Sequence, residues 1–220
     1  MKIVLFIPIK LNNQRLPGKN TILLNGKPLC NYIFDTVKNL DCVDEKYVYC
    51  SNEEIIPYIP AEMKFLKRDV RLDRDETLGE EIYDAFIKQV DADLYILVHT
   101  TSPFLKATTI ENAVSQIQNN DFDSALSVKK IQTFVWYDNQ PLNYSLCKIP
   151  RTQDINPVVV ETSAFYVFKK EVWTNLHQRI GKKPYFAIID NIESVDIDNR
   201  EDFEFAEIIT ELYNKKSSIL

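Results

Sequence analysis

The chain has 220 residues, of which 45% are hydrophobic and 26% are charged, and its formal net charge is −6. This length is enough for one sizeable hydrophobic core, and the composition is that of a globular domain, which excludes disordered, collagen-like and coiled-coil chains. The negative charge argues against a nucleic-acid binder that depends on phosphate neutralisation, but it leaves room for a small basic pocket.

The sequence also indicates the setting of the protein. Its four cysteines form no CxxC pair and both histidines are isolated, so we expect reduced thiols rather than a zinc site. No apolar stretch approaches the roughly 20 residues that span a bilayer, and the N-terminus lacks the pattern of a signal peptide. We therefore expect a cytoplasmic protein that contacts neither nucleic acid nor a membrane.

Apolar runs and one-sided apolar periodicity alternate along the chain. In chain order they predict a strand at 3–7, a helix at 29–40, strands at 46–50 and 63–67, a helix at 77–90, a strand at 94–98, a helix at 108–119, strands at 124–128 and 161–168, and helices at 170–178 and 200–213. This alternation is typical of the α/β class, so we expect one domain over residues 1–220, in three layers around a mostly parallel sheet. An irregular excursion is expected at about 131–158, and its aromatic cluster at 134–137 can form a dimer interface or equally belong to the core.

A basic loop follows the first predicted strand. Open α/β sheets bind their ligands beyond the carboxyl ends of the strands, so this loop is a candidate site. It carries Lys10, Arg15 and Lys19, together with Gly18, one of only four glycines, which we expect where the backbone requires one, as at Gly26. Three cations and a run of backbone amides suit a polyphosphate, although neither GxxxxGK[ST] nor GxGxxG is present. A solvated surface loop is the alternative interpretation.

Two carboxylates near the C-terminal end, Asp196 and Asp198, form a DxD pair. On a strand, residues two apart lie on the same face, so the pair can share a hard cation such as Mg²⁺, which bridges substrate phosphates. A solvated strand end is the alternative for the pair alone. Together with the basic loop, the pair favours a site for a metal-bound nucleotide.

Ordered segments along nearly the whole chain carry a family resemblance. They are LPGKN and GKPL (16–20 and 26–29), YCSNEEI (49–55), the stretch 68–75, TSP (101–103), DSALSV (123–128), RTQD (151–154), and SVDID with EDF (194–198 and 201–203). In order and spacing they resemble the signatures of the CMP-acylneuraminate synthetases and the related CMP-Kdo synthetases, which are cytidylyltransferases. The resemblance implies a Rossmann-like nucleotidyltransferase fold with a small protruding segment, and a homodimer.

The resemblance also implies an activity and a set of residues. CTP would bind over the first loop, the hydroxyl of an acid sugar would attack the α-phosphorus, and pyrophosphate would leave, in the service of surface polysaccharide biosynthesis. Catalytic roles fall to Lys10, Arg15, Lys19 and Asp198, and Mg²⁺ to Asp196 and Asp198. The residues expected to bind CTP are Lys10, Asn12, Gln14, Arg15, Lys19, Asn20, Arg68 and Thr77. Those expected to bind the acceptor are His99, Thr101, Arg151, Glu161 and Thr162. Alternatively, Arg68 is a surface cation and Asn20 only closes a turn.

The chain departs from the family pattern at several of these positions. The family's loop lysine is replaced by Gln14, so the positive charge at the α-phosphate is expected from Arg15 or Lys10. On the acceptor side, the arginine of the family's RENGA stretch is Val160 and the second arginine of its RRQD stretch is Thr152. Residues on the nucleotide side are therefore mostly kept, whereas arginines that bind the acceptor carboxylate are lost.

Three functions are compatible with this pattern. The first is CMP transfer to an acid sugar, and the second is CMP transfer to a phosphate- or phosphonate-bearing acceptor, which gives a CDP-type product. The third is a catalytically silent relative that binds nucleotide. The presence of both Asp196 and Asp198 argues against the third function, and the loss of the acceptor arginines shifts weight from the first function towards the second, which stays the alternative.

Overall fold

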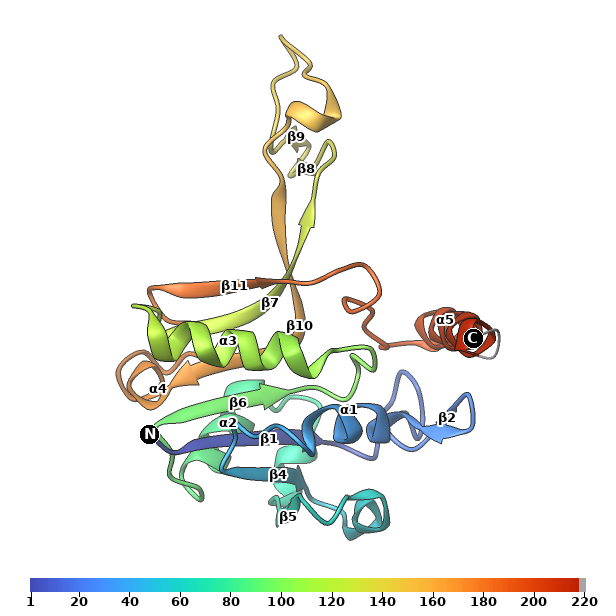
Figure 1. Ribbon diagram of the computed structural model, residues 1–220, viewed down its shortest axis with the longest axis vertical. Coiled ribbons are helices and arrows are strands. Elements are labelled where there is room, and N and C mark those ends of the chain that lie inside the picture. Colours follow the sequence, from blue (N-terminus) through green and yellow to red (C-terminus); the bar gives the residue numbers. More distant parts are fainter. Residues whose placement is uncertain (218–220) are drawn as a thin grey trace.

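A computed structural model of the protein describes residues 1–217. At its centre is a seven-stranded sheet in the order β11-β7-β10-β6-β1-β4-β5 (Figure 1). β10 runs antiparallel to both of its neighbours, and the other four strand pairs are parallel. The strands are β1 (Ile3–Ile9), β4 (Glu45–Cys50), β5 (Lys64–Lys67), β6 (Leu94–Val98), β7 (Ser124–Ile131), β10 (Val158–Lys169) and β11 (Pro184–Ile188). The predicted α/β class and mostly parallel sheet are confirmed.

The predicted helices are present with adjusted ends. They are α1 (Leu29–Val37), α2 (Gly79–Ile87), α3 (Ala107–Asn119), α4 (Lys170–Leu176) and α5 (Arg200–Ser217). Short pieces connect them: β2 (Leu23–Leu24), β3 (Lys27–Pro28), β8 (Trp136–Tyr137), β9 (Gln140–Pro141) and the 3₁₀ turns Glu53–Tyr58, Val70–Asp73 and Thr152–Asp154. α2 begins two residues later than predicted because the Glu81 carboxylate accepts the N–H of Leu78 at 2.7 Å and closes the first turn there.

The central strand β1 shows why the fold has three layers. Its alternate residues Ile3, Leu5, Ile7 and Ile9 pack into a core that contains α1 and α3, while Val4 and Phe6 face a second core that contains α2 and α4. Successive side chains of a strand point to opposite faces, so a continuous apolar run fills both cores. Phe6, for example, stacks on Phe86 of α2 with ring centroids 4.2 Å apart.

A third apolar cluster holds the DxD segment against the body. Val195 and Ile197 are buried in it with Leu16 of the basic loop and Phe203 of α5. The prediction that Asp196 and Asp198 lie on a strand is wrong: residues 195–198 belong to the connection between β11 and α5 and to no strand. Its alternation of apolar and acidic residues comes from burial against α5 rather than from a sheet. β11 itself was not predicted, since this edge strand begins with a proline and exposes Phe186 and Ile188.

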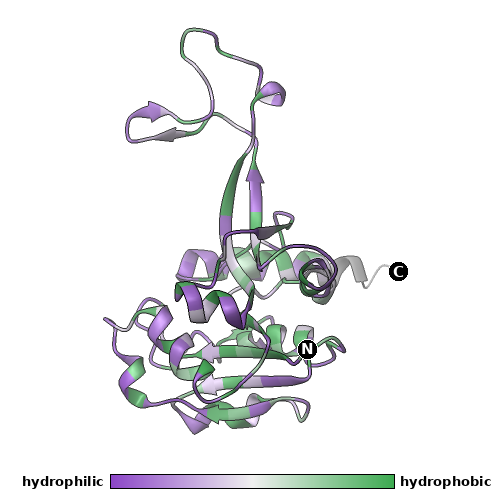
Figure 2. Cartoon of the chain, turned by 90° about the vertical axis from the view of Figure 1, so that its left-hand side faces the viewer, coloured by the Kyte–Doolittle hydropathy of each residue, from purple (hydrophilic) through white to green (hydrophobic). Residues whose placement is uncertain are grey.

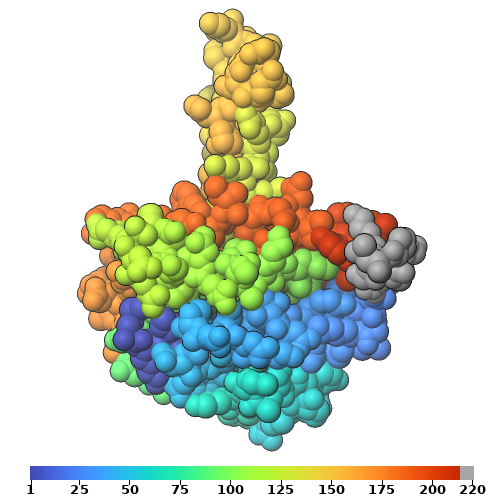
Figure 3. All heavy atoms as spheres, viewed as in Figure 1, coloured from blue at the N-terminus to red at the C-terminus, as the bar shows by residue number. Residues whose placement is uncertain are grey.

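β7 and β10 extend beyond the sheet and carry a protruding arm at 132–157, which stands clear of the body (Figures 1 and 3). Trp136 and Tyr137 on this arm are 53% and 75% exposed, so the interpretation of these side chains as core is wrong. In Figure 2 the strands of the body are largely hydrophobic, whereas the arm mixes both kinds of residue. Within the described residues, the helices are too short or too polar for a transbilayer segment.

Candidate active site

The basic loop is braced from within at the carboxyl end of β1. Gly18 has a φ of +67°, a conformation that favours glycine, and Gly26 has a φ of +80°. The buried Asn20 amide donates to the carbonyl oxygen of Lys10 at 2.8 Å, and its oxygen accepts a hydrogen bond from Thr100 at 2.5 Å. Asn20 therefore ties the two ends of the loop to the residues that follow β6, which fits the interpretation that it closes the loop.

Two cations of the basic loop, Lys19 and Arg15, both contact Asp198. The Lys19 ammonium lies 3.1 Å from Asp198 Oδ1 and donates to the carbonyl oxygen of Ile197 at 2.9 Å, while Arg15 Nη1 lies 3.0 Å from Asp198 Oδ2. Burial by itself would raise the pKa of Asp198, but the hydrogen bond and charge of Lys19, with those of Arg15, lower this pKa below its usual value. Asp198 is therefore a stable carboxylate between two cations.

Asp196 has a different environment. Its Oδ1 is buried and, within the described chain, accepts no hydrogen bond. Burial raises the pKa of Asp196, a hydrogen bond from the Thr101 side chain opposes this, and the charge of Asp198 raises the pKa further. A buried carboxylate oxygen without a donor, next to a second carboxylate, fits a site for a hard divalent cation.

Lys10 and Gln14 both contact the carboxylate of Asp75, which ends the motif stretch 68–75 but was given no role from the sequence. The Lys10 ammonium lies 2.8 Å from Asp75 Oδ1, and the Gln14 amide donates to the other oxygen of the same group. The Asp75 side chain is 57% exposed, so this pairing is an exposed one. A bound polyphosphate would compete with Asp75 for the Lys10 charge.

Arg68 is buried, with a side chain that is 1% exposed, so its interpretation as a surface cation is wrong. Its Nη2 donates to the carbonyl oxygen of Ile9 at 2.9 Å and to Asp73 at 2.5 Å, and Asp73 also accepts a hydrogen bond from Ser51. These bonds connect the carboxyl ends of β1, β4 and β5. In this geometry Arg68 holds the floor of the site rather than presenting its charge to solvent.

Asn12 and Thr77, also predicted to bind CTP, lie in two neighbouring cavities. Asn12 and Gln14 line a cavity of about 420 Å³ whose wall contains Asp73 and Asp75. Thr77 lines an adjacent cavity with Arg71 and Glu81, into which none of the loop residues 10–20 projects. The structure thus brings Asn12 and Gln14 into the cluster and leaves Thr77 at its margin.

On the predicted acceptor side, His99 and Thr101 come directly after β6. The ring Nδ1 of His99 lies 2.5 Å from the carbonyl oxygen of Ser163, and burial lowers the pKa of His99, so the ring is neutral near pH 7. The Thr101 carbonyl oxygen accepts the N–H of Ile197 at 2.8 Å. Thr101 therefore belongs with the carboxylate pair, and His99 lies between the loop and β10.

Glu161 and Thr162 lie at an irregularity of β10, where Ser163 adopts a φ of +58°. The Thr162 hydroxyl donates to the buried Ser127 at 2.8 Å and is thus bound within the sheet rather than free for an acceptor. Glu161 accepts hydrogen bonds from Tyr166 and, at 3.2 Å, from Arg179. No motif pointed to Arg179, because it belongs to the short connection between α4 and β11.

Arg151 is the predicted acceptor residue that the structure separates from the others. It lies on the arm, its side chain is 74% exposed, and it pairs with Asp154 at 2.7 Å. The arm projects away from the body of the molecule (Figure 1), so Arg151 lies apart from the basic loop and the carboxylate pair of its own chain. The sequence could not show this, because the RTQD segment resembles the family whether it folds back or projects.

Comparisons with known proteins show the family of the chain. A family model described as "Cytidylyltransferase" matches residues 4–218. The chain is 23% identical to an N-acylneuraminate cytidylyltransferase of Streptococcus agalactiae serotype V, over 92% of this chain and 52% of that protein. It is 28% identical to a CMP-N,N'-diacetyllegionaminic acid synthase of Legionella pneumophila, over 96% of this chain and 97% of that protein. The chain thus spans about half the length of the streptococcal relative and nearly all of the other.

Solved structures show the same fold. A CMP:2-keto-3-deoxy-manno-octonic acid synthetase complexed with CTP superposes with a TM-score of 0.72 at 17% identity, covering 97% of this chain and all of that one. A 4-diphosphocytidyl-2C-methyl-D-erythritol synthase from Anaerococcus prevotii superposes with a TM-score of 0.69 at 12% identity, covering 96% of each chain. At these identities the likeness concerns the fold.

Proposed function

The chain belongs to the cytidylyltransferase family, as its motifs predicted, and we propose that it transfers CMP from CTP to a small acidic sugar and releases pyrophosphate. One observation carries the proposal for this chain: Arg15 and Lys19 meet Asp198 at 3.0 and 3.1 Å, at the carboxyl end of β1. Cations for a triphosphate and a carboxylate for its metal thus lie in one place, where α/β sheets bind nucleotides.

The proposed reaction needs alignment and charge stabilisation more than covalent catalysis. A hydroxyl oxygen of the acceptor attacks the α-phosphorus of CTP, and the bond to the leaving pyrophosphate breaks. Negative charge grows on the phosphate oxygens as this happens, so fixed cations contribute most in the transition state. We propose that Lys10, Arg15 and Lys19 supply that positive charge and that Gln14 acts as a neutral hydrogen-bond donor. Asn20 supports the loop, and Arg68 supports the ends of the strands beneath it.

Asp196 and Asp198 are proposed to hold Mg²⁺. The described residues contain no group of three metal-binding side chains, so the remaining ligands would be phosphate oxygens and water, as is common for Mg²⁺. When bound, the ion neutralises phosphate charge and orients the triphosphate. Both Asp198 oxygens contact cations in this structure, so Arg15, whose side chain is 75% exposed, is the partner best placed to move to the phosphates.

The acceptor is proposed to be an acid sugar of the sialic, legionaminic or Kdo type, because the relatives are named for such compounds. The product would then be an activated sugar for surface polysaccharide. A phosphate-bearing acceptor is the second candidate. It is favoured by the absence of arginine at positions 152 and 160 and by the fold neighbour whose name contains a diphosphocytidyl product.

The arm supports the proposal of a homodimer. Besides Trp136 and Tyr137, it exposes Leu142, Leu146 and Ile149 by 56–66%, which is typical of a surface that a partner covers. In such a dimer Arg151 would serve the cleft of the other chain. Light scattering tests this: we expect about twice the 25.7 kDa chain mass, and the chain mass for Trp136→Glu with Tyr137→Glu. Leu23→Glu, an exposed apolar site on β2, is the matched control and should stay dimeric.

Nucleotide choice is tested by thermal-shift titration with CTP, UTP, ATP and GTP in the presence of Mg²⁺. A ligand at one hundred times its Kd stabilises the folded state by about 2.7 kcal/mol, which raises the Tm of a domain of this size by about 5–10 °C. We expect CTP to give this rise in Tm at a lower concentration than UTP, ATP or GTP. Equal or greater stabilisation by another triphosphate would contradict the proposal.

The reaction is tested by pyrophosphate release from CTP with two panels of acceptors. One contains acid sugars, and the other contains phosphosugars and phosphorylated amino acids. Release with an acid sugar supports the proposed function, and release with phosphorylated acceptors alone supports the second candidate. Binding of CTP without release on either panel would indicate a silent nucleotide-binding protein.

A further inference from the structure

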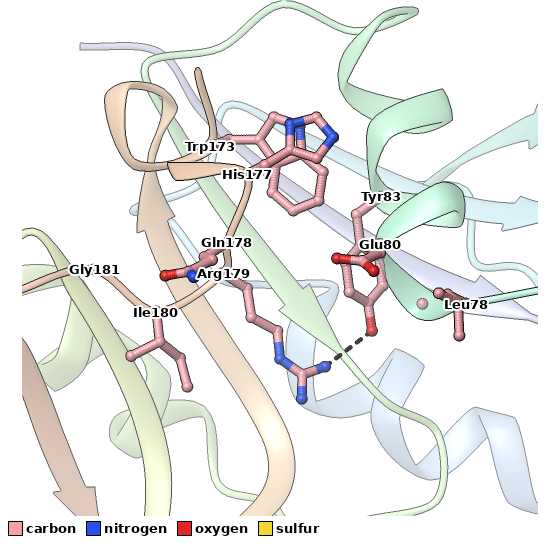
Figure 4. A pocket seen from close by; sticks show the side chains of 10 residues that line it. Leu78, Glu80, Tyr83, Trp173, His177, Gln178, Arg179, Ile180 and Gly181 are labelled. Atoms are coloured by element: carbon pink, nitrogen blue, oxygen red, sulfur yellow. Dashed lines mark hydrogen bonds between the residues drawn. The ribbon is translucent and has the colours of Figure 1, made fainter. Parts of the chain in front are cut away.

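A cavity of about 610 Å³ opens between the start of α2 and the connection that follows α4 (Figure 4). It lies on the predicted acceptor side, because Arg179 in its wall contacts Glu161 and the ring of Tyr166. The motifs assigned nothing to this cavity. Its lining residues are Leu78, Gly79, Glu80, Tyr83, Trp173, His177, Gln178, Arg179, Ile180 and Gly181.

Arg179 provides the positive charge of this cavity. Its Nη1 donates to the Tyr83 hydroxyl at 3.0 Å, its Nη2 donates to Glu161 at 3.2 Å, and its guanidinium lies 3.8 Å from the centroid of the Tyr166 ring. A guanidinium has five N–H donors, and within the described chain two of them have these partners. Arg179 is therefore oriented by its surroundings and still has donors for an anion.

Tyr83 adds a second donor beside Arg179. Burial raises the pKa of Tyr83 above its usual value, so the phenol stays protonated and can donate its own hydrogen while accepting one from Arg179. Gly79 makes this position possible, because a Cβ there would lie 2.9 Å from the Tyr83 hydroxyl oxygen. The two donors, which Figure 4 shows joined by a hydrogen bond, are spaced for the two oxygens of one carboxylate.

The segment that carries Arg179 is held firmly. α4 ends at His177, which has a φ of +56°, and the chain then returns to the start of β7. There Gly181 donates its N–H to Ser124 at 2.8 Å, and Lys182 donates its N–H to the Asp123 carboxylate at 2.7 Å. These anchors lie within three residues of Arg179, so its position is set before a ligand arrives.

His99, which follows β6, lies close to the surroundings of Arg179. The His99 ring lies 6.2 Å from the Tyr166 ring, on which the Arg179 guanidinium packs. Burial lowers the pKa of His99, and the charges of Arg179 and Lys19 lower it further against the bond to Ser163, so both cations act on this ring.

We infer that Arg179 and the Tyr83 hydroxyl bind the carboxylate of the acceptor and so replace the arginines absent at positions 152 and 160. This inference rests on the proposed function, since it concerns the acid sugar of that reaction. Glu161 accepts a hydrogen bond from Arg179, and the acceptor carboxylate would take over that bond while Glu161 keeps its bond from Tyr166. Glu80 in the cavity wall and Glu161 beside Arg179 disfavour an anion that does not meet Arg179.

The test compares an acid with its uncharged ester. N-acetylneuraminic acid, 2-keto-3-deoxy-manno-octonic acid and their methyl esters are used as acceptors at saturating CTP, with the wild type, Arg179→Gln and Arg179→Lys. We expect Arg179→Gln to raise KM for the acid about 10- to 100-fold, the value of one charge-assisted hydrogen bond, and to change KM for the ester and for CTP less than about twofold. Arg179→Lys should restore part of the loss, because it keeps the charge but not the fork.

Two further variants keep the test decisive. Lys170→Gln removes an exposed cation at the start of α4, where Lys170 pairs with Asp91, and should leave both KM values unchanged. Tyr83→Phe removes only the hydroxyl and should weaken the acid about fivefold without affecting the ester, which tests the inference even where Arg179→Gln does not fold.

The outcomes separate the two proposals. An equal change of acid and ester in Arg179→Gln, or an unchanged KM for the acid, overturns the role of Arg179 while the proposed function stands. Failure of the wild type to release pyrophosphate with every acid sugar overturns the proposed acceptor and, with it, this inference.

Discussion

The two sides of the cleft hold their cations in different ways. On the nucleotide side, Lys10 and Arg15 pair with Asp75 and Asp198, whose side chains are 57% and 40% exposed. On the acceptor side, the side chains of Arg179 and its partner Glu161 are 31% and 39% exposed, but the guanidinium also packs on Tyr166 and donates to Tyr83. Exposed pairs contribute little to stability and exchange partners readily, whereas a guanidinium packed on aromatic rings keeps its place.

This contrast suggests a division of labour. The nucleotide side is suited to a ligand with several negative charges, which can draw Lys10 and Arg15 away from the carboxylates that they contact. The acceptor side is suited to a single carboxylate that must be oriented, so that one hydroxyl meets the α-phosphate. Orientation needs a fixed partner, and a polyphosphate needs several movable ones.

The largest effect is expected for Asp198→Asn, which removes the carboxylate that both Lys19 and Arg15 contact. Loss of one metal ligand and of the partner of Lys19 and Arg15 should lower kcat about 10³-fold, while circular dichroism shows an intact fold. Glu204→Gln, which breaks the exposed pair of Arg200 on α5, is the control and should keep full activity. If Asp198→Asn kept most of its activity at saturating Mg²⁺, Asp196 and Asp198 would not be the metal site.

The movable cations of the loop come next. Arg15→Ala and Lys10→Ala should each lower kcat about 10²-fold, the scale of losing one electrostatic stabiliser of the transition state. Gln14→Ala should lower it much less, because a neutral amide donor is roughly half as strong as a charged one, and Gln14→Lys should be neutral or activating. Steady-state kinetics on the four variants decides this. The opposite order, with Gln14→Ala the most damaging, would mean that the loop works through its neutral donor.

Asp196→Asn should separate stability from activity. The raised pKa of Asp196, caused first by burial, means that its negative charge destabilises the folded state above that pKa. The neutral amide should therefore raise Tm at pH 7 by about 2–4 °C, the shift that ~1 kcal/mol gives a domain of this size, while kcat falls less than in Asp198→Asn. The gain should shrink as the pH falls towards the ordinary aspartate value of 3.8. A lower Tm at pH 7 would show that the charge is compensated without a metal.

The smallest effect is expected at His99, between the two sides. Burial lowers the pKa of His99 in the folded state, so the unfolded chain binds a proton more readily. The free energy of unfolding therefore has its full value above about pH 6.5 and decreases as the pH falls below it. Thermal melts should show that the Tm of the wild type falls between pH 7 and pH 5 by about 1–2 °C more than that of His99→Gln.

Much of the molecule follows from sequence alone, for local reasons. The continuous apolar run of β1 has only one folded use, a strand between two layers, and the same holds for β6. The loop at 10–20 carries its cations within a few residues of one another, so their common location needs no knowledge of the fold. Asp196 and Asp198 likewise stay together in any extended conformation, even though they proved not to lie on a strand.

The remaining features depend on contacts between distant positions. Arg15 and Asp198 are 183 residues apart, Lys10 and Asp75 are 65 apart, and Arg179 and Tyr83 are 96 apart. No periodicity or spacing rule connects such pairs, because the order of strands in the sheet decides which loops meet at its edge. For the same reason Arg151, which the motif placed with the acceptor, projects on the arm, and Arg179, which belongs to no motif, lies beside the cleft. The packing of apolar residues decides which charged residues meet in the folded chain. The sequence next to each charged residue does not show which distant residue it will meet.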